Sequence, residues 1–110
     1  MTQKTTQVHD VLALEALPPG GQHVWQHGLD RVLLCRGLDG QVSAMRDLCP
    51  HARQPLAGGS VDAQGITCPK HGARFDLRSG EPLNAVCKRP LSMLQARIED
   101  GRILVELPSF

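Results

Sequence analysis

The stretch CPHARQPLAGGSVDAQGITCPKHG, residues 49–72, contains two short clusters that each join one cysteine to one histidine. One proline separates Cys49 from His51, and a proline and a lysine separate Cys68 from His71. Sixteen residues lie between the two clusters. Both side chains of a cluster can face one point when the cluster lies in a loop. Two such loops supply a complete set of two thiolates and two imidazoles, which predicts a metal centre.

Two kinds of metal centre accept this set of ligands. A single zinc ion binds two Cys and two His tetrahedrally, and a two-iron, two-sulfide cluster binds both Cys on one iron and both His on the other. Zinc fingers usually gather their cysteines in one pair and their histidines in another, whereas each loop here supplies one of each. This division suits a cluster held between two loops that both touch both irons. A structural zinc module without a redox role remains an alternative.

Length and composition predict a single small domain, residues 1–110, with an aliphatic core because only 3% of the residues are aromatic. The net charge is +1 and the basic residues are scattered, so we expect no nucleic-acid partner; the densest basic spot, Lys88-Arg89, is too small for a polyanion site. The N-terminus lacks a signal-peptide pattern and the longest apolar run is short, which predicts a cytoplasmic protein without a membrane span. Four cysteines in a reducing compartment favour metal or redox chemistry over disulfides.

Short runs of strand character, separated by turn residues, predict an all-β fold: a small antiparallel β sandwich or barrel. The residues Asp100-Gly101 predict a two-residue turn between the last two runs. A brief helical turn is expected just before Pro18-Pro19, which would end it. The expected elements are strands over 31–37, 40–47 (with Val42, Ala44 and Met45 inward), 94–100 and 102–107, a hairpin over 73–83, and the helical turn over 12–17.

The segments CPH (49–51) and CPKHGARFDLRSGEPL (68–83) resemble the Rieske signature of Cys-x-His, sixteen residues, then Cys-x2-His-Gly and an aromatic residue, here Phe75. The surrounding DLCPH, PLAGG and SGEPL also match, and the resemblance covers most of the chain. More narrowly, the chain is similar to the small Rieske ferredoxins that serve bacterial ring-hydroxylating oxygenases. The resemblance implies a Rieske-like fold in which a cluster-binding subdomain, about 47–83, carries the two ligand loops.

The resemblance also implies the cofactor and the roles of its ligands. One [2Fe-2S] cluster is expected, with Cys49 and Cys68 on the buried iron and His51 and His71 on the outer iron, near solvent. The implied function is that of a soluble one-electron carrier, not an enzyme. It would pass electrons from a flavin-containing ferredoxin reductase to a terminal non-haem iron oxygenase in aromatic hydrocarbon catabolism, and it is expected to be a monomer when isolated. A small Rieske subunit of a nitrite reductase-like enzyme is the alternative within the family.

Departures from other Rieske subtypes refine this expectation. Gln54 and Lys70 stand where the Rieske proteins of respiratory and photosynthetic cytochrome complexes have an extra cysteine in each loop, so no disulfide can join the loops. The chain also contains no Tyr to donate a hydroxyl to a cluster sulfur. Fewer donors stabilise the reduced cluster less, so the reduction potential is expected at the low end of the Rieske range.

The remaining candidate residues fall into two groups. Near the ligands, prolines are expected to stiffen the loops, glycines to let backbone N–H groups approach a cluster sulfur or to serve simple turns, and polar side chains to surround the exposed tip and shape docking. These residues are Pro50 and Pro69, then Gly58, Gly59 and Gly72, then Arg53, Gln54 and Lys70. Away from the ligands, Phe75 and Cys35 are expected in the core, while His9, His23 and His27 are expected to be solvated. Cys87 falls in AVCKRPL, a segment that folds over the cluster in this family, and its role stays open.

Overall fold

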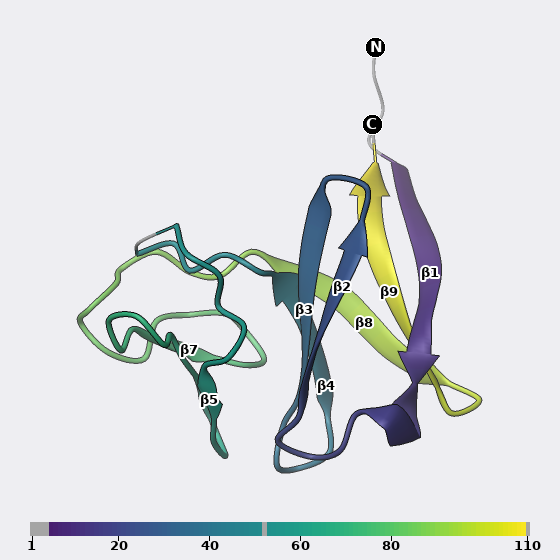
Figure 1. Cartoon of the computed structure of the whole chain (residues 1–110), viewed down its shortest axis with the longest axis horizontal. Coiled ribbons are helices and arrows are strands. Elements are labelled where there is room, and N and C mark those ends of the chain that lie inside the picture. The colour runs from purple at the N-terminus through teal and green to yellow at the C-terminus, as the bar shows by residue number, and fades with distance from the viewer. Residues whose placement is uncertain (1–4, 52, 110) are drawn as a thin grey trace.

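The structure is a computed structural model that describes residues 5–51 and 53–109, and it consists of two lobes (Figure 1). The larger lobe is a curled sheet, and the smaller one is a set of loops around a short sheet. The elements of the described residues are β1 (Thr5–Ala13), η1 (Leu14–Ala16), β2 (Gln22–His27), β3 (Asp30–Arg36), β4 (Val42–Arg46), β5 (Ser60–Val61), β6 (Gly65–Thr67), β7 (Arg74–Asp76), β8 (Met93–Glu99) and β9 (Arg102–Ser109).

The larger sheet has the strand order β1-β9-β8-β4-β3-β2, the smaller one the order β5-β6-β7, and all of their pairings are antiparallel. This confirms the predicted all-β fold. The larger sheet curls so that its two edge strands, β1 and β2, approach each other. Ring contacts show this closeness: the ring centre of His9 lies 5.2 Å from that of Trp25 and 4.4 Å from that of His27. His23 and His27 are exposed, as expected, but the expectation of a solvated His9 was wrong: it is half-buried in these ring contacts.

The sequence predicted the local elements of the larger lobe but not its edge strands. In the β8–β9 hairpin Glu99 pairs with Arg102, so Asp100 and Gly101 form the predicted two-residue turn, with φ of 50° and 73°. The helical turn is present as η1, a 3-10 helix of three residues, and no helix in the described chain has the length and apolar character needed to cross a bilayer. Strands β1 and β2 were not predicted.

The segment 73–83 folds back on itself, but it does not form the complete hairpin that the sequence predicted. Only β7 is a strand; the returning arm meets it at one bridge, between Phe75 and Pro82. Between the arms, the Asp76 carboxylate accepts hydrogen bonds from the backbone N–H groups of Arg78 and Ser79, which fixes the turn. The fold-back places Phe75 under the second ligand loop with no exposed surface, as predicted.

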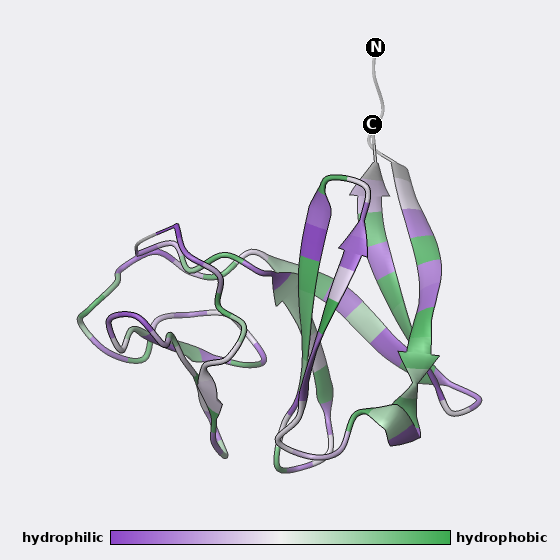
Figure 2. Cartoon of the chain, viewed as in Figure 1, coloured by the Kyte–Doolittle hydropathy of each residue, from purple (hydrophilic) through white to green (hydrophobic). Residues whose placement is uncertain are grey.

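Strands β3 and β4 form a wall shared by two hydrophobic cores. In β3, Leu33 and Cys35 face the core of the smaller lobe, whereas Val32 and Leu34 face the core of the curled sheet, because successive side chains of a strand point to opposite faces. Both faces are covered, so β3 is hydrophobic along most of its length in Figure 2, whereas β1 and β9 alternate. The smaller lobe therefore rests on a rigid, doubly buried strand pair.

This shared wall makes a matched pair of predictions. Leu33→Ala and Leu34→Ala should each lower the free energy of unfolding by about 2–5 kcal/mol, because each removes a fully buried side chain. Only Leu33→Ala opens a cavity under the loops of the smaller lobe. We expect denaturant unfolding followed by Trp25 fluorescence to show similar losses for both, and bound iron to be lost sooner from Leu33→Ala alone. Equal rates of iron loss from the two variants would contradict the two-core arrangement.

Candidate metal centre

The first ligand loop is closed by two backbone hydrogen bonds around Cys49. Its N–H donates to the carbonyl oxygen of Gln54 at 2.8 Å, and its own carbonyl accepts from the N–H of Arg53 at 2.8 Å. Arg53 has a φ of 53°, in the left-handed region that side chains other than glycine rarely adopt. The loop thus turns sharply between the cysteine and the residue four positions later.

The second ligand loop repeats the first one. The N–H of Cys68 donates to the carbonyl oxygen of Ala73 at 2.7 Å, and its carbonyl accepts from the N–H of Gly72 at 3.1 Å. The spacings, to the fifth and fourth residue onward, equal those of the first loop, and Gly72 has a positive φ of 75° where the first loop has Arg53. Each loop also follows a strand, β4 or β6, as predicted. The two Cys/His clusters are therefore structural repeats of each other.

The loops place the two thiols inside the lobe and the two imidazoles at its surface. Cys49 is fully buried and Cys68 is 1% exposed, whereas His51 and His71 are both exposed. The two imidazole rings lie edge to face, with their centres 5.0 Å apart. Two imidazoles that bind one tetrahedral ion at about 2.1 Å have their ring centres about 5 Å apart. The histidine pair therefore has the spacing of two ligands to a common ion, with the thiols behind it.

This arrangement fits a two-iron cluster in which each iron has two protein ligands. Among the described residues, no group of three or more His, Cys, Asp or Glu side chains converges on one point to hold a single metal ion. A cluster with two thiolates on one iron and two imidazoles on the other does not need such a group, because bridging sulfides complete the coordination of each iron.

A buried carboxylate that the sequence analysis missed ties the ligand loops to the curled sheet. The Asp47 side chain has no exposed surface, and one of its oxygens accepts hydrogen bonds from the N–H groups of Leu56 and Ala57, both at 2.8 Å. Its other oxygen accepts from Nε of Arg31 at 2.6 Å. Asp47 thus joins strand β3 to the chain that leaves the first loop. The sequence signal that could have pointed to Asp47 is its position two residues before Cys49, in the DLCPH segment.

The glycine pair after the first loop lies close to the second. A Cβ atom on Gly59 would stand 2.1 Å from the carbonyl oxygen of Thr67, the residue before Cys68, so only glycine fits. The side chain of Gln22, on β2, accepts from the N–H of Gly58 and donates to the carbonyl of Gly59. These contacts hold the two loops at a fixed separation, while the expected approach of the glycine N–H groups to a cluster sulfur stays a prediction.

An arginine–carboxylate pair braces the strands beneath the second loop. Arg74, on β7, donates to both oxygens of Asp62, with the shortest contacts at 2.7 Å. The Asp62 carboxylate also accepts from the N–H groups of Gln64 and Gly65 at 2.9 Å. These bonds, that from Arg74 foremost, lower the pKa of Asp62 to about 2. The pair fixes the β5–β6 turn against β7.

The two cysteines outside the ligand loops differ in position. Cys35 is fully buried in β3; burial and, to a lesser extent, the Asp47 carboxylate raise its pKa to about 12, so it is an inert core residue, as predicted. Cys87 is 6% exposed, and its thiol donates to the carbonyl of Arg89 at 3.6 Å. It packs in the core of the smaller lobe and lines a groove beside His51, which places the 84–90 segment next to the first loop.

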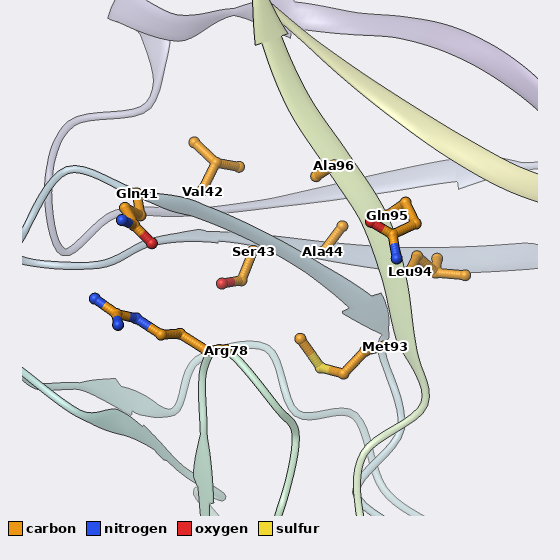
Figure 3. Close-up of a pocket in the computed structure, with 9 residues that line it drawn as sticks. All are labelled: Gln41, Val42, Ser43, Ala44, Arg78, Met93, Leu94, Gln95 and Ala96. Atoms are coloured by element: carbon orange, nitrogen blue, oxygen red, sulfur yellow. The ribbon is translucent and has the colours of Figure 1, made fainter.

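A second groove lies at the junction of the lobes, away from the histidines. It has a volume of about 320 Å³ and lies between β4, β8 and the side chain of Arg78, as Figure 3 shows. Arg78 also forms an ion pair with Asp39 of the larger lobe at 3.0 Å. No Cys or His side chain lines this groove. Its residues join the two lobes.

Comparison with known proteins identifies the family of this arrangement. The sequence model of the Rieske [2Fe-2S] domain matches residues 7–103. Ferredoxin CarAc of Metapseudomonas resinovorans is 32% identical over 65 residues, which cover 59% of this chain and 61% of that protein. The chain thus spans less than two thirds of the length of the first curated relatives it matches.

Solved structures agree with the sequence comparison. The ferredoxin of carbazole 1,9a-dioxygenase from Nocardioides aromaticivorans IC177 has a TM-score of 0.81 and 33% identity, covering 89% of this chain and 95% of that one. A chain in a complex of reduced oxygenase and oxidized ferredoxin in carbazole 1,9a-dioxygenase has a TM-score of 0.82 and 26% identity, covering 89% and 91%. A nitrite reductase small subunit from Mycobacterium tuberculosis has a TM-score of 0.84 but 22% identity, covering 96% and 99%, and shares the fold alone.

The buried carboxylate predicts a specific sensitivity of the first loop. Asp47→Asn should lower the free energy of unfolding by about 2–3 kcal/mol, because one amide oxygen cannot accept all three hydrogen bonds and its NH2 group would face a buried donor. The matched control is Asp30→Asn, which removes the half-exposed partner of Arg46 and should cost less than about 1 kcal/mol. Denaturant unfolding of both variants measures the difference; equal losses would show that Asp47 does not anchor the loops.

The lowered pKa of Asp62 predicts a dependence of stability on acid. Its ionised form is favoured in the folded protein, so the stabilisation is fully present above the unfolded pKa of 3.8 and is lost as the pH falls through about 2. Asp62→Asn should therefore be less stable than the wild type at pH 6, and the gap should narrow between pH 4 and about 2. Thermal unfolding over this pH range measures it. A gap that does not change with pH would contradict the Arg74–Asp62 pairing.

Proposed function

Because this chain belongs to the Rieske [2Fe-2S] domain family, we propose that it carries single electrons between two protein partners. The observation that supports this most directly is the opposite burial of the two kinds of ligand. The thiols of Cys49 and Cys68 lie inside the lobe, while the rings of His51 and His71 lie at the surface, edge to face. A centre bound in this way would touch the surface through its imidazoles, where an electron can enter and leave.

Cys49, His51, Cys68 and His71 would hold the cluster, which supplies a one-electron couple when bound. The backbone hydrogen bonds of the two loops, the Asp47 carboxylate and the close contact at Gly59 hold these four side chains in position. A rigid frame keeps the ligands in one geometry in both oxidation states, which favours fast electron transfer. Neutral imidazoles in place of two thiolates would raise the potential above that of an all-cysteine cluster.

We infer the partners from the relatives. A solved complex joins a similar ferredoxin to the oxygenase of carbazole 1,9a-dioxygenase, and other relatives are ferredoxin components of dioxygenase systems for p-cumate and naphthalene. We propose that this protein takes electrons from a flavin-containing ferredoxin reductase and delivers them to a terminal non-haem iron oxygenase, and that it works in the cytoplasm. A nitrite reductase partner is supported by a shared fold alone, at 22% identity.

A ligand exchange tests the proposal. His51→Cys should lower the reduction potential by on the order of 100 mV or more, because Rieske centres lie at about −150 mV and above while all-cysteine plant-type centres lie near −400 mV. His27→Cys is the matched control, since it exchanges an exposed histidine on β2 and should leave the potential unchanged. Spectroelectrochemical titration of the three proteins, purified without oxygen, measures both shifts.

The outcomes separate the alternatives. A colourless wild-type protein that contains zinc and no iron would favour the structural zinc module and refute the electron carrier. A coloured protein in which His51→Cys has the wild-type potential would show that His51 is not a ligand. Copurification with a sirohaem-containing enzyme would point to a nitrite reductase in place of the oxygenase.

A further inference from the structure

The described basic side chains fall into two groups, those that have a partner within the chain and those that have none. Among the described residues, six arginines form ion pairs with carboxylates and a seventh, Arg36, donates to the backbone carbonyls of Leu17 and Gly40. In the described part of the chain, the cations whose side chains have neither an acidic partner nor a backbone carbonyl partner are Arg53, Lys70, Lys88 and Arg89, and all four are exposed.

These four cations surround the histidine tip. Arg53 belongs to the first ligand loop, and Lys70 precedes His71 in the second. Lys88 and Arg89 line a groove of about 290 Å³ together with Pro50, His51, Val86 and Cys87. The resemblance places the AVCKRPL segment over the cluster, although 34 residues of chain lie between His51 and Val86. The fold brings this pair to the edge of the first loop.

The ligand loops and the segment 84–90 contain no carboxylate of their own. The chain has no Asp or Glu in the segments 48–61, 63–75 and 82–98, which include both ligand loops and the segment 84–90. The acidic residues without a basic partner among the described ones include Glu15 and Asp100, which line a groove at η1 and the β8–β9 turn. Figure 1 shows that turn and the ligand loops at opposite ends of the molecule. The unpaired cations therefore gather at the histidine end, whereas the described carboxylates without an ion-pair partner are spread over the molecule and include Asp76 and Glu81 of the smaller lobe.

We propose that the tip formed by Arg53, Lys70, Lys88 and Arg89 selects a terminal oxygenase whose surface carries carboxylates around the point where the electron enters. This inference rests on the proposed function and adds the charge of the partner to it. The exposed side chain of Val86, 40% accessible, supplies an apolar contact within the same groove. An oxygenase with a basic entry surface would be repelled, so the tip charge sets which oxygenase this ferredoxin can serve.

The physical basis is electrostatic steering. Four unpaired charges of one sign around an exit point raise the encounter rate with an oppositely charged acceptor and lower it with a like-charged one. The effect is large at low salt and is screened when the Debye length falls to about 3 Å at 1 M salt. The gathering of unpaired cations at one end also turns the histidine end toward an acidic partner before contact.

Two small oxidants of opposite charge test the inference on the cluster-containing protein. Reduced protein is mixed with ferricyanide, an anion, or with hexaamminecobalt(III), a cation, and the oxidation rate is followed by stopped flow at low and high salt. The test variant is Lys88→Glu/Arg89→Glu. The matched control is Arg97→Glu/Arg102→Glu, which makes the same change in net charge on β8 and β9. Visible absorbance and thermal unfolding verify that both variants are folded and contain iron.

We expect the test variant to lose about tenfold in rate with ferricyanide and to gain about tenfold with hexaamminecobalt(III) at low salt, with both effects vanishing at high salt. The control should change each rate by less than about twofold. Rates that shift in the same direction with both oxidants would indicate a changed potential and overturn the inference, as would equal effects in the control. A protein that cannot be reduced at all would instead overturn the proposed function.

Discussion

Two loops have to be held face to face at a fixed distance, and the rest of the structure serves this constraint. Each loop is closed by the same two backbone hydrogen bonds at its cysteine, but each contains only one thiol and one imidazole, half of the candidate ligand set. The separation of the loops is set outside them, by the Asp47 carboxylate, by Gln22, and by the contact between Gly59 and Thr67 that excludes any side chain. A small lobe with few strands can position four ligands because these bonds anchor it to a doubly buried pair of strands.

The division of burial between the ligands follows from the same frame. A thiol points inward from the start of each loop, and an imidazole points outward from its crest. The interior thus supplies a dry environment for two sulfurs, and the surface supplies two rings whose centres are 5.0 Å apart. The proposed function would therefore be concentrated at the histidine end of the molecule, where the unpaired cations also lie.

The candidate site could be proposed from the sequence because its four candidate ligands are local. One continuous stretch contains Cys49, His51, Cys68 and His71, and the prolines and glycines around them indicate loops. The anchor was not predictable in the same way, since the partners of Asp47 lie 16 residues before it and 9 and 10 residues after it, and only the folded chain joins them. Lys88 and Arg89 are an intermediate case: the resemblance placed their segment over the cluster, and the fold adds that the pair lines a groove beside His51.

The edge strands show where reasoning from the sequence ends. Strand β1 pairs with β9 across almost the full length of the chain, and its residues contain no turn signal that indicates this partner. The central claim, by contrast, is local and can be tested directly. Protein purified without oxygen should contain iron and acid-labile sulfide in equal amounts, two of each per chain, as a [2Fe-2S] centre requires. One zinc ion per chain, with no iron and no labile sulfide, would contradict the account.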